Sequence, residues 1–200
     1  KGLGTEGLIT HGVFFAHPRE AIEYHYERTT DDPRITHAFT LEVDPFGVAT
    51  KSAAVGYPRR SDKSPLDEQT TVAITLSEND VFHSPSTTDL VDTTSWYRIG
   101  VPIETRSYQL TGVALQTDAI YSFQEMLDAA TAAIAIQYED TPSIMSVQKR
   151  LLSHSQSRYY IQDLSGEGAR GGLLLHALPY RTYTEVFAST LIDAVLSSRA

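Results

Sequence analysis

The sequence of 200 residues contains no cysteine and no long hydrophobic run. Without cysteine, these residues form no disulfide, supply no thiol nucleophile and hold no cysteine-ligated zinc. A membrane-spanning helix needs roughly 18 or more consecutive apolar residues. The longest helical apolar stretch, residues 126–136, is interrupted by Asp128 and Thr131. These absences exclude a disulfide-stapled fold and predict no membrane-spanning helix.

Positive charge is also scarce, because Lys and Arg total 16 against 25 Asp and Glu, giving a formal net charge of −9. Nucleic acids and anionic membrane surfaces both attract basic residues. We therefore predict no nucleic-acid partner and no direct binding to a membrane. The 41% of hydrophobic residues is enough to bury a core, and eleven tyrosines and seven phenylalanines favour strands.

The length suits one domain or a piece of a larger one. The sequence begins at Lys1 rather than at a methionine, and it shows no signal-peptide pattern. We therefore expect residues 1–200 to be a single segment of a longer protein.

Residues 8–112 have a strand-rich pattern. Ile22, Tyr24 and Tyr26 alternate with polar residues, which predicts a half-buried strand. Residues 35–43 predict a second strand and residues 48–57 a third, together an antiparallel meander. Further strands are expected at residues 69–78, 95–99 and 104–110, the last two separated by Gly100 and Pro102.

Two turns connect the predicted strands of the meander. Asp-Asp-Pro at residues 31–33 is typical of a turn, because Asp bonds its own backbone and Pro presets φ. The tetrapeptide at residues 44–47 matches a type I turn, with Asp first, Pro second and Gly fourth. The predicted structural turn residues are Asp31, Asp32, Pro33, Asp44, Pro45 and Gly47.

One segment changes to a helical period. Ser122 and Glu125 have the spacing of a capping box, and apolar residues follow at helical intervals, which predicts a helix over about 122–137. Residues 147–183 are strand-rich again, with Pro179 at an edge or bulge, and a short helix is expected at about 184–196. The predicted fold class is mainly β, with one or two helices.

Residues 166–171 spell G-x-G-x-x-G, the fingerprint of a dinucleotide site. That motif needs a buried strand before it and a helix after it. Here a polar stretch precedes it, and an apolar stretch ending at Pro179 follows it. We therefore predict a loop and no nucleotide site.

No other constellation predicts chemistry. His25 and His37 could face each other across the first turn, but two histidines without a third ligand make a weak metal site. Arg59 and Arg60 could grip an acidic partner, although such a pair is more often solvated. A G-x-S-x-G elbow is absent. We therefore predict no catalytic residue, no metal ligand and no cofactor.

Two alternatives to a structural role stay open. One is a carbohydrate-active hydrolase that uses a carboxylate pair, such as Glu23 with Glu27 or Asp31 with Asp32, although a sequence does not show their separation. The other is a β-sandwich surface adhesion module.

Several blocks resemble the middle-to-C-terminal region of the B component of insecticidal Tc toxin complexes, a region related to Salmonella-plasmid-virulence proteins. The resemblance runs from about Val13 to the end. It is most specific over residues 24–60, where order and spacing agree. The blocks are residues 24–28, 31–37, 41–44 with Gly47, 51–53, 57–60, 104–112, 147–151 and 177–180.

The resemblance implies a structural role. In this family the B component pairs with a C component, and the two build a hollow β-sheet shell from RHS/YD-type repeats around the toxic part of the C component. A propeller of the B component docks the shell onto the A-component channel. The implied partners are thus the remainder of the B component, the cargo-bearing C component and, indirectly, the A-component channel.

Within that family, residues 43–47 resemble the turn of a YD repeat, with Val43 where Tyr is usual. The implied location is that of a secreted bacterial toxin made in the bacterial cytoplasm. Virulence-plasmid relatives carry an ADP-ribosyltransferase in a separate domain, which requires a Glu-x-Glu pair. This sequence has no such pair, so that activity is not expected here.

Overall fold

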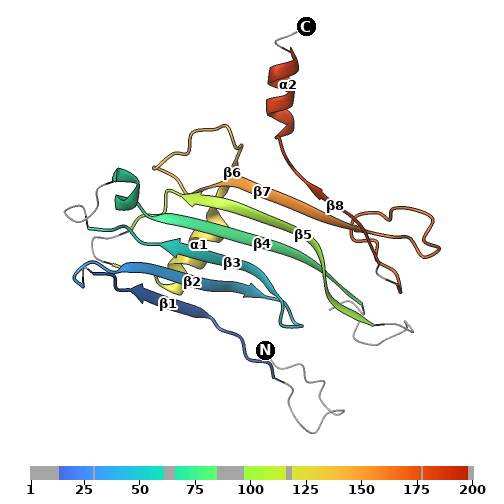
Figure 1. The fold of residues 1–200 in the computed structure, drawn as a ribbon, viewed down its shortest axis with the longest axis horizontal. Helices are drawn as coiled ribbons and strands as arrows, with labels where there is room; N and C mark the ends of the chain where they lie inside the picture. The colour runs from blue at the N-terminus through green and yellow to red at the C-terminus, as the bar shows by residue number, and fades with distance from the viewer. Residues whose placement is uncertain are drawn as a thin grey trace.

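A computed structural model describes residues 14–28, 30–60, 66–84, 97–115, 119–176 and 178–197. These residues form one eight-stranded sheet in the order β1-β2-β3-β4-β5-β7-β6, with β8 paired to the far half of β7 (Figure 1). All the pairs are antiparallel except β6 with β7. The strands are β1 Glu20–His25, β2 Arg34–Val43, β3 Ala49–Gly56, β4 Ala73–Ser84, β5 Arg98–Thr111, β6 Ile134–Ile136, β7 Gln148–Tyr159 and β8 Pro179–Thr184.

Three helical elements accompany the sheet in the part of the chain that the structure describes. They are the 3-10 helix η1 Asp67–Thr70 and the α-helices α1 Phe123–Ala132 and α2 Ser189–Ser197. The mainly β fold class with two α-helices is thus confirmed. No helix among the described residues is long and apolar enough to cross a membrane.

The core lies between the sheet and α1, which crosses behind the central strands in Figure 1. Alternate residues of β2, β3, β4 and β5 point to α1, as period two requires. Leu76 of β4 and Met126 of α1 are completely buried at its centre. The other buried members are Phe39, Leu41, Ala53, Val55, Ile74, Tyr108, Leu110, Tyr121, Ala129 and Ala130.

The helix α1 begins as predicted and ends earlier. The Ser122 hydroxyl accepts from the Glu125 amide and the Glu125 carboxylate accepts from the Ser122 amide, so the capping box is present. The helix stops at Ala132 instead of about residue 137, because Ala133 is already extended. The next residue, Ile134, donates its amide to the Val147 carbonyl at 3.0 Å. Pairing with the edge of β7 therefore replaces the last predicted turn.

Several strands differ from their predicted form. The β1 strand forms, but it is exposed throughout rather than half-buried, because it is an edge strand that only β2 accompanies. The β5 strand is continuous through Gly100, which adopts a left-handed φ of +68°, so the two strands expected there are one. The final helix begins at Ser189, because residues 179–184 pair with β7. The β-leaning pattern of residues 8–13 lies outside the described residues.

Candidate functional site

A buried carboxylate organises a cluster of charged side chains on the sheet. Glu104, on β5, has a side chain that is only 2% exposed. It accepts hydrogen bonds from Arg106 on the same strand, from His154 on β7, and from Nε of Arg170 at 2.8 Å. Arg170 also donates to Asp80 of β4. Three strands and one loop therefore meet in this cluster, with Arg170 linking Asp80 to Glu104.

His154 lies between two carboxylates. Its Nδ1 is 2.8 Å from Oε2 of Glu185, just after β8, and its Nε2 bonds Oε1 of Glu104. An ionised carboxylate only accepts hydrogen bonds, so a ring that bonds two of them donates from both nitrogens. The cluster thus sets the side chains of Arg106, Arg170 and His154 against three carboxylates.

These contacts govern the acidity of Glu104. Burial by itself would raise its pKa, but the hydrogen bonds from Arg170 and His154 and the charge of Arg106 hold the pKa below its ordinary value. The pKa of Arg170 is raised in turn, chiefly by its hydrogen bond to Glu104. These contacts favour the charged form of Glu104, and its oxygens are occupied by partners from its own chain.

Arg170 explains the glycine motif of residues 166–171. The segment is an irregular loop between β7 and β8, as predicted, and no helix begins directly after it in the described residues. A Cβ on Gly168 would lie 3.0 Å from the Tyr159 carbonyl, so glycine permits the loop to fold tightly onto β7. Its function in the fold is to present Arg170 to Glu104. Sequence reasoning missed this role, since Arg170 and Glu104 lie 66 residues apart.

The turn at residues 44–47 closes the hairpin of β2 and β3. The Gly47 amide donates to the Asp44 carbonyl at 3.1 Å, and Gly47 has a φ of +88°. Oδ1 of Asp44 accepts from the amides of Phe46 and Val48 at 2.8 and 3.0 Å. Pro45 occupies the second position of the turn. The Asp44 side chain therefore stabilises the turn by accepting hydrogen bonds from two of its backbone amides.

The turn at residues 31–33 has a second role. Asp32 is buried, and its carboxylate accepts from Nε of Arg59 at 2.9 Å and from the amide of Arg60 at 3.2 Å. Asp31 and Pro33 flank it in the loop between β1 and β2. The expectation of a solvated Arg59 is wrong, because its side chain is 17% exposed and paired with Asp32.

The histidines and carboxylates considered from the sequence do not converge. His25 pairs with Arg34 in the β1–β2 ladder, whereas His37 lies opposite Ile22, so the two histidines do not face each other. No group of three or more His, Asp or Glu in the described residues is placed to hold a metal ion. In the proposed hydrolase pairs, Glu27 forms an ion pair with Arg34 at 3.2 Å, and Asp32 is committed to Arg59.

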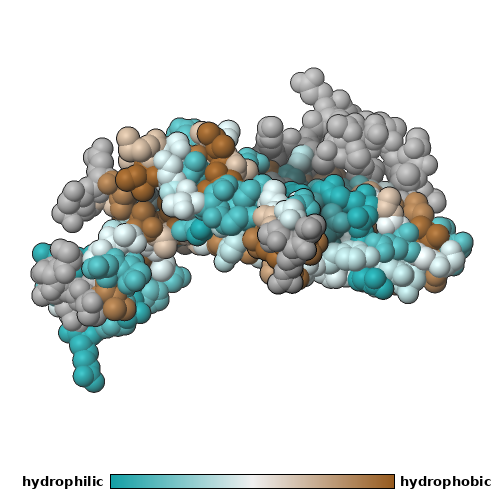
Figure 2. Space-filling model, turned by 90° about the horizontal axis from the view of Figure 1, so that it is seen from above, coloured by the Kyte–Doolittle hydropathy of each residue, from teal (hydrophilic) through white to brown (hydrophobic). Residues whose placement is uncertain are grey.

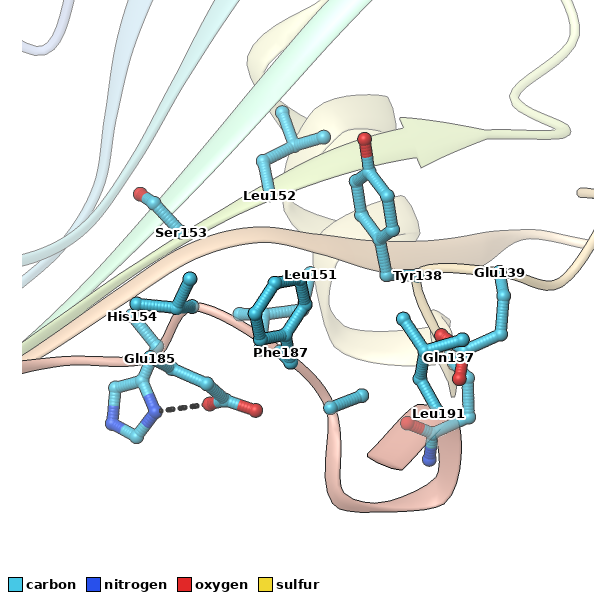
Figure 3. A pocket seen from close by; sticks show the side chains of 12 residues that line it. Gln137, Tyr138, Glu139, Leu151, Leu152, Ser153, His154, Glu185, Phe187 and Leu191 are labelled. Carbon is cyan, nitrogen blue, oxygen red and sulfur yellow. Dashed lines mark hydrogen bonds and ion pairs between the residues drawn. The ribbon is translucent and has the colours of Figure 1, made fainter. Parts of the chain in front are cut away.

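A groove of about 410 Å³ opens beside the charge cluster. Figure 3 shows His154 and Glu185 at one end, Gln137 and Glu139 at the other, and Phe187 between them. Its remaining lining is mostly apolar: Tyr138, Leu151, Leu152, Ser153, Val186, Ala188 and Leu191.

Part of this chain is similar to a known protein family. Residues 3–95 match the model of the insecticide toxin TcdB middle/C-terminal region. The matched residues make up just under half of the chain. The match includes the β1–β2–β3 meander with both of its turns. No curated protein sequence matches the chain.

Solved structures extend the likeness over the rest of the fold. A crystal structure of TcdB2-TccC3 matches 97% of this chain and 9% of its own, with 21% identity and a TM-score of 0.65. TcdB2-TccC3 without its hypervariable C-terminal region matches 90% of this chain and 8% of its own, with 22% identity and a TM-score of 0.60.

A Tc holotoxin pore from Photorhabdus luminescens matches 90% of this chain and 8% of its own, with 20% identity and a TM-score of 0.58. This chain therefore spans under a tenth of the length of the solved chains that it matches. At this level of identity, the likeness shows a shared fold.

Proposed function

We propose that this chain is a non-catalytic structural segment of a Tc toxin B component, and that its sheet forms part of the shell that encloses the cytotoxic cargo of the C component. The observation that carries this proposal is the family match over residues 3–95 together with a fold match that covers nearly the whole chain. The structural neighbours are TcdB2-TccC3 complexes and a Tc holotoxin pore. The partners proposed here are accordingly the rest of the B component, the C component and, indirectly, the A-component channel of a secreted toxin.

The architecture supports a wall rather than a binding cleft. One face of the sheet packs on α1, whereas the residues of the central strands that point the other way are small or polar. Ala54 lies beside Thr75, Thr75 beside Gln109, and Ser77 beside Ser107 in the ladders. Seen from above, the molecule is a flattened, elongated body with hydrophobic side chains exposed among hydrophilic ones (Figure 2).

The charge cluster fits the same role. Its carboxylates and cations bind one another, so it joins β4, β5, β7 and the loop of residues 161–178 rather than presenting a free acid, base or nucleophile. These hydrogen bonds and ion pairs hold together the end of the sheet that α1 does not cover.

The test uses the full-length B component that carries this segment, produced together with its C component. Leu76→Asp places a charge at a completely buried position, which is expected to prevent assembly of the complex and delivery of the cargo. Leu164→Asp is the matched control, because Leu164 is 45% exposed and has a positive φ that Asp tolerates.

A second variant separates structure from catalysis. Glu23→Gln with Glu27→Gln removes two carboxylates that a hydrolase reading requires, and delivery is expected to persist. The structural proposal fails if Leu76→Asp assembles and delivers normally. It also fails if the double Gln variant assembles normally but loses toxicity.

A further inference from the structure

The groove beside the charge cluster is a gap in the sheet. The β6 strand pairs with β7 only as far as Arg150, and β8 pairs with it from Ser155 onward, with one further bond from the Glu185 amide to the His154 carbonyl. Because β6 is parallel to β7 and β8 is antiparallel, the C-terminal ends of both strands point into the gap. Residues 151–153 of β7 therefore have neither strand beside them.

The two ends of this gap carry carboxylates with spare acceptor capacity. Among the described residues, Glu139 accepts from Thr190 through Oε1 at 3.0 Å, and Glu185 bonds His154 through Oε2 at 2.8 Å. Each carboxylate has a second oxygen at the rim. Carboxylate oxygens of this kind bind Lys, Arg or backbone N–H donors.

The floor and walls of the gap are apolar and open to solvent. Leu152 is 47% exposed, Tyr138 59%, Phe187 62% and Val186 76%. On one side the patch continues onto α2, which has no buried residue and exposes Ile192, Val195 and Leu196. A contiguous apolar surface with a polar rim is typical of a protein contact.

We propose that this groove receives a turn or short extended segment from elsewhere in the same B-component polypeptide, which presents one large apolar side chain with a basic residue beside it. The inference rests on the proposed function. The same polypeptide is favoured as the source because the solved chains that match are more than ten times as long as this segment. Completing a gap inside an existing sheet also continues the layer that this chain begins.

The occupant is short because β6 and β8 already pair with this edge of β7 on either side of residues 151–153. Only three β7 positions are open to it, whereas a full strand occupies about five or six residues. The cavity volume suits one large side chain with a few backbone atoms. A cationic neighbour of that side chain would meet the second oxygen of Glu139 or Glu185.

Thiol labelling of the full-length B component tests this proposal, after subtraction of the labelling of the unsubstituted protein. Leu152→Cys reports on the groove, and Leu164→Cys is its control, because the two leucines are 47% and 45% exposed in this chain. A maleimide is expected to react with the Leu152→Cys variant about tenfold or more slowly than with the control. This difference is expected in the B component alone, before the C component is added.

The remaining outcomes overturn the proposal. Equal labelling of the two variants, with and without the C component, means that the groove is open. Protection that appears only when the C component is present assigns the groove to a partner chain instead. Hydrogen exchange of the amides of residues 151–153 in the unsubstituted B component, measured with and without the C component, distinguishes the same outcomes without a mutation.

The proposed basic residue of the occupant, which would meet Glu139 or Glu185, is tested separately. Adding Glu139→Lys to the Leu152→Cys variant is expected to accelerate labelling several-fold, whereas Glu68→Lys, at an exposed position in η1, leaves the rate unchanged. An unchanged rate with Glu139→Lys rejects the basic residue. The outcome is separable from the shell role, because labelling reports groove occupancy whether or not Leu76→Asp prevents delivery.

Discussion

Nε2 of His83 lies 2.7 Å from Oδ2 of Asp44, a residue 39 positions earlier in the chain. The Gly100 amide donates to Nδ1 of the same ring at 3.2 Å, so the imidazole proton is on Nε2 and the ring is neutral. Phe46 stacks on the ring with centroids 4.5 Å apart. The β2–β3 turn is thereby fastened to the far end of β4 and β5.

Replacing Asp44 with Ala is expected to release this turn. The amides of Phe46 and Val48 and the ring N–H of His83 all lose their acceptor, which should lower the local opening free energy by about 2–3 kcal/mol. Hydrogen exchange of the β2–β3 hairpin measures the effect. Asp67→Ala in η1, a surface position, serves as control, and identical exchange in both variants would contradict the prediction.

Removal of Arg170 should loosen the loop between β7 and β8. The Arg170→Ala variant leaves the Glu104 carboxylate with two of its three hydrogen-bonding partners, at an expected cost of about 2 kcal/mol once the 45% exposure of Arg170 is considered. Arg98→Ala is the matched control, because Arg98 is exposed and, among the described residues, its side chain donates only to the Tyr97 carbonyl. Proteolysis within residues 161–178 should accelerate in the first variant and not in the second.

His37 predicts a loss of stability in mild acid. Its ring is buried, Tyr57 bonds Nδ1 at 3.1 Å, and Glu20 faces Nε2 at 3.4 Å. Burial lowers the pKa of His37 below 6.5, although Glu20 opposes the shift. The unfolded chain therefore binds more protons, so this contribution is complete above pH 6.5 and declines as the pH falls toward the folded pKa.

The pH effect is measured by hydrogen exchange of β1 and β2 between about pH 7.5 and about pH 5, corrected for intrinsic rates. His37→Gln keeps an acceptor for Tyr57 but does not titrate, so its opening free energy should vary less with pH. His176→Gln, at an exposed loop position, should behave like the unsubstituted protein. A pH slope that survives His37→Gln would assign the effect to another group.

Two glycines with the same backbone conformation should respond differently to alanine. Gly112 has a φ of +74°, and a Cβ there would lie 2.0 Å from the Ser146 carbonyl oxygen. Gly171 has a φ of +69°, with nothing within 4 Å of the added carbon. Gly171→Ala should cost about 1–2 kcal/mol from the left-handed conformation alone. Gly112→Ala should cost clearly more, as measured by local exchange in β5 and β7, and equal costs would refute the close approach.

Local patterns predicted the elements that depend on local chemistry. Phe39 and Leu41 alternate and are buried on one face of β2, and Ser122 with Glu125 begins α1 as expected. The end of α1 was not predictable in the same way. Ala133 to Ile136 have a helical sequence, but pairing with the edge of β7, which lies later in the chain, makes them extended.

The polar contacts were beyond local reasoning for the same physical reason. Each depends on groups far apart in sequence: Glu104 and His154 are 50 residues apart, and Arg59 lies 27 residues from Asp32. A charged residue in a loop has the same local pattern whether it is solvated or paired. Arg59 and Arg170 acquire their partners only when the strands are assembled.

The sequence by itself determined the mainly β fold class, the positions of the two turns and the start of α1, because period, capping and turn chemistry act over a few residues. It also carried the resemblance to the Tc toxin B component. Only the tertiary structure decided which strands are edges, which charges are buried together, and where β7 lacks a neighbour. Those features depend on the pairing of segments distant in the chain, and hydrophobic burial on α1 selects that pairing.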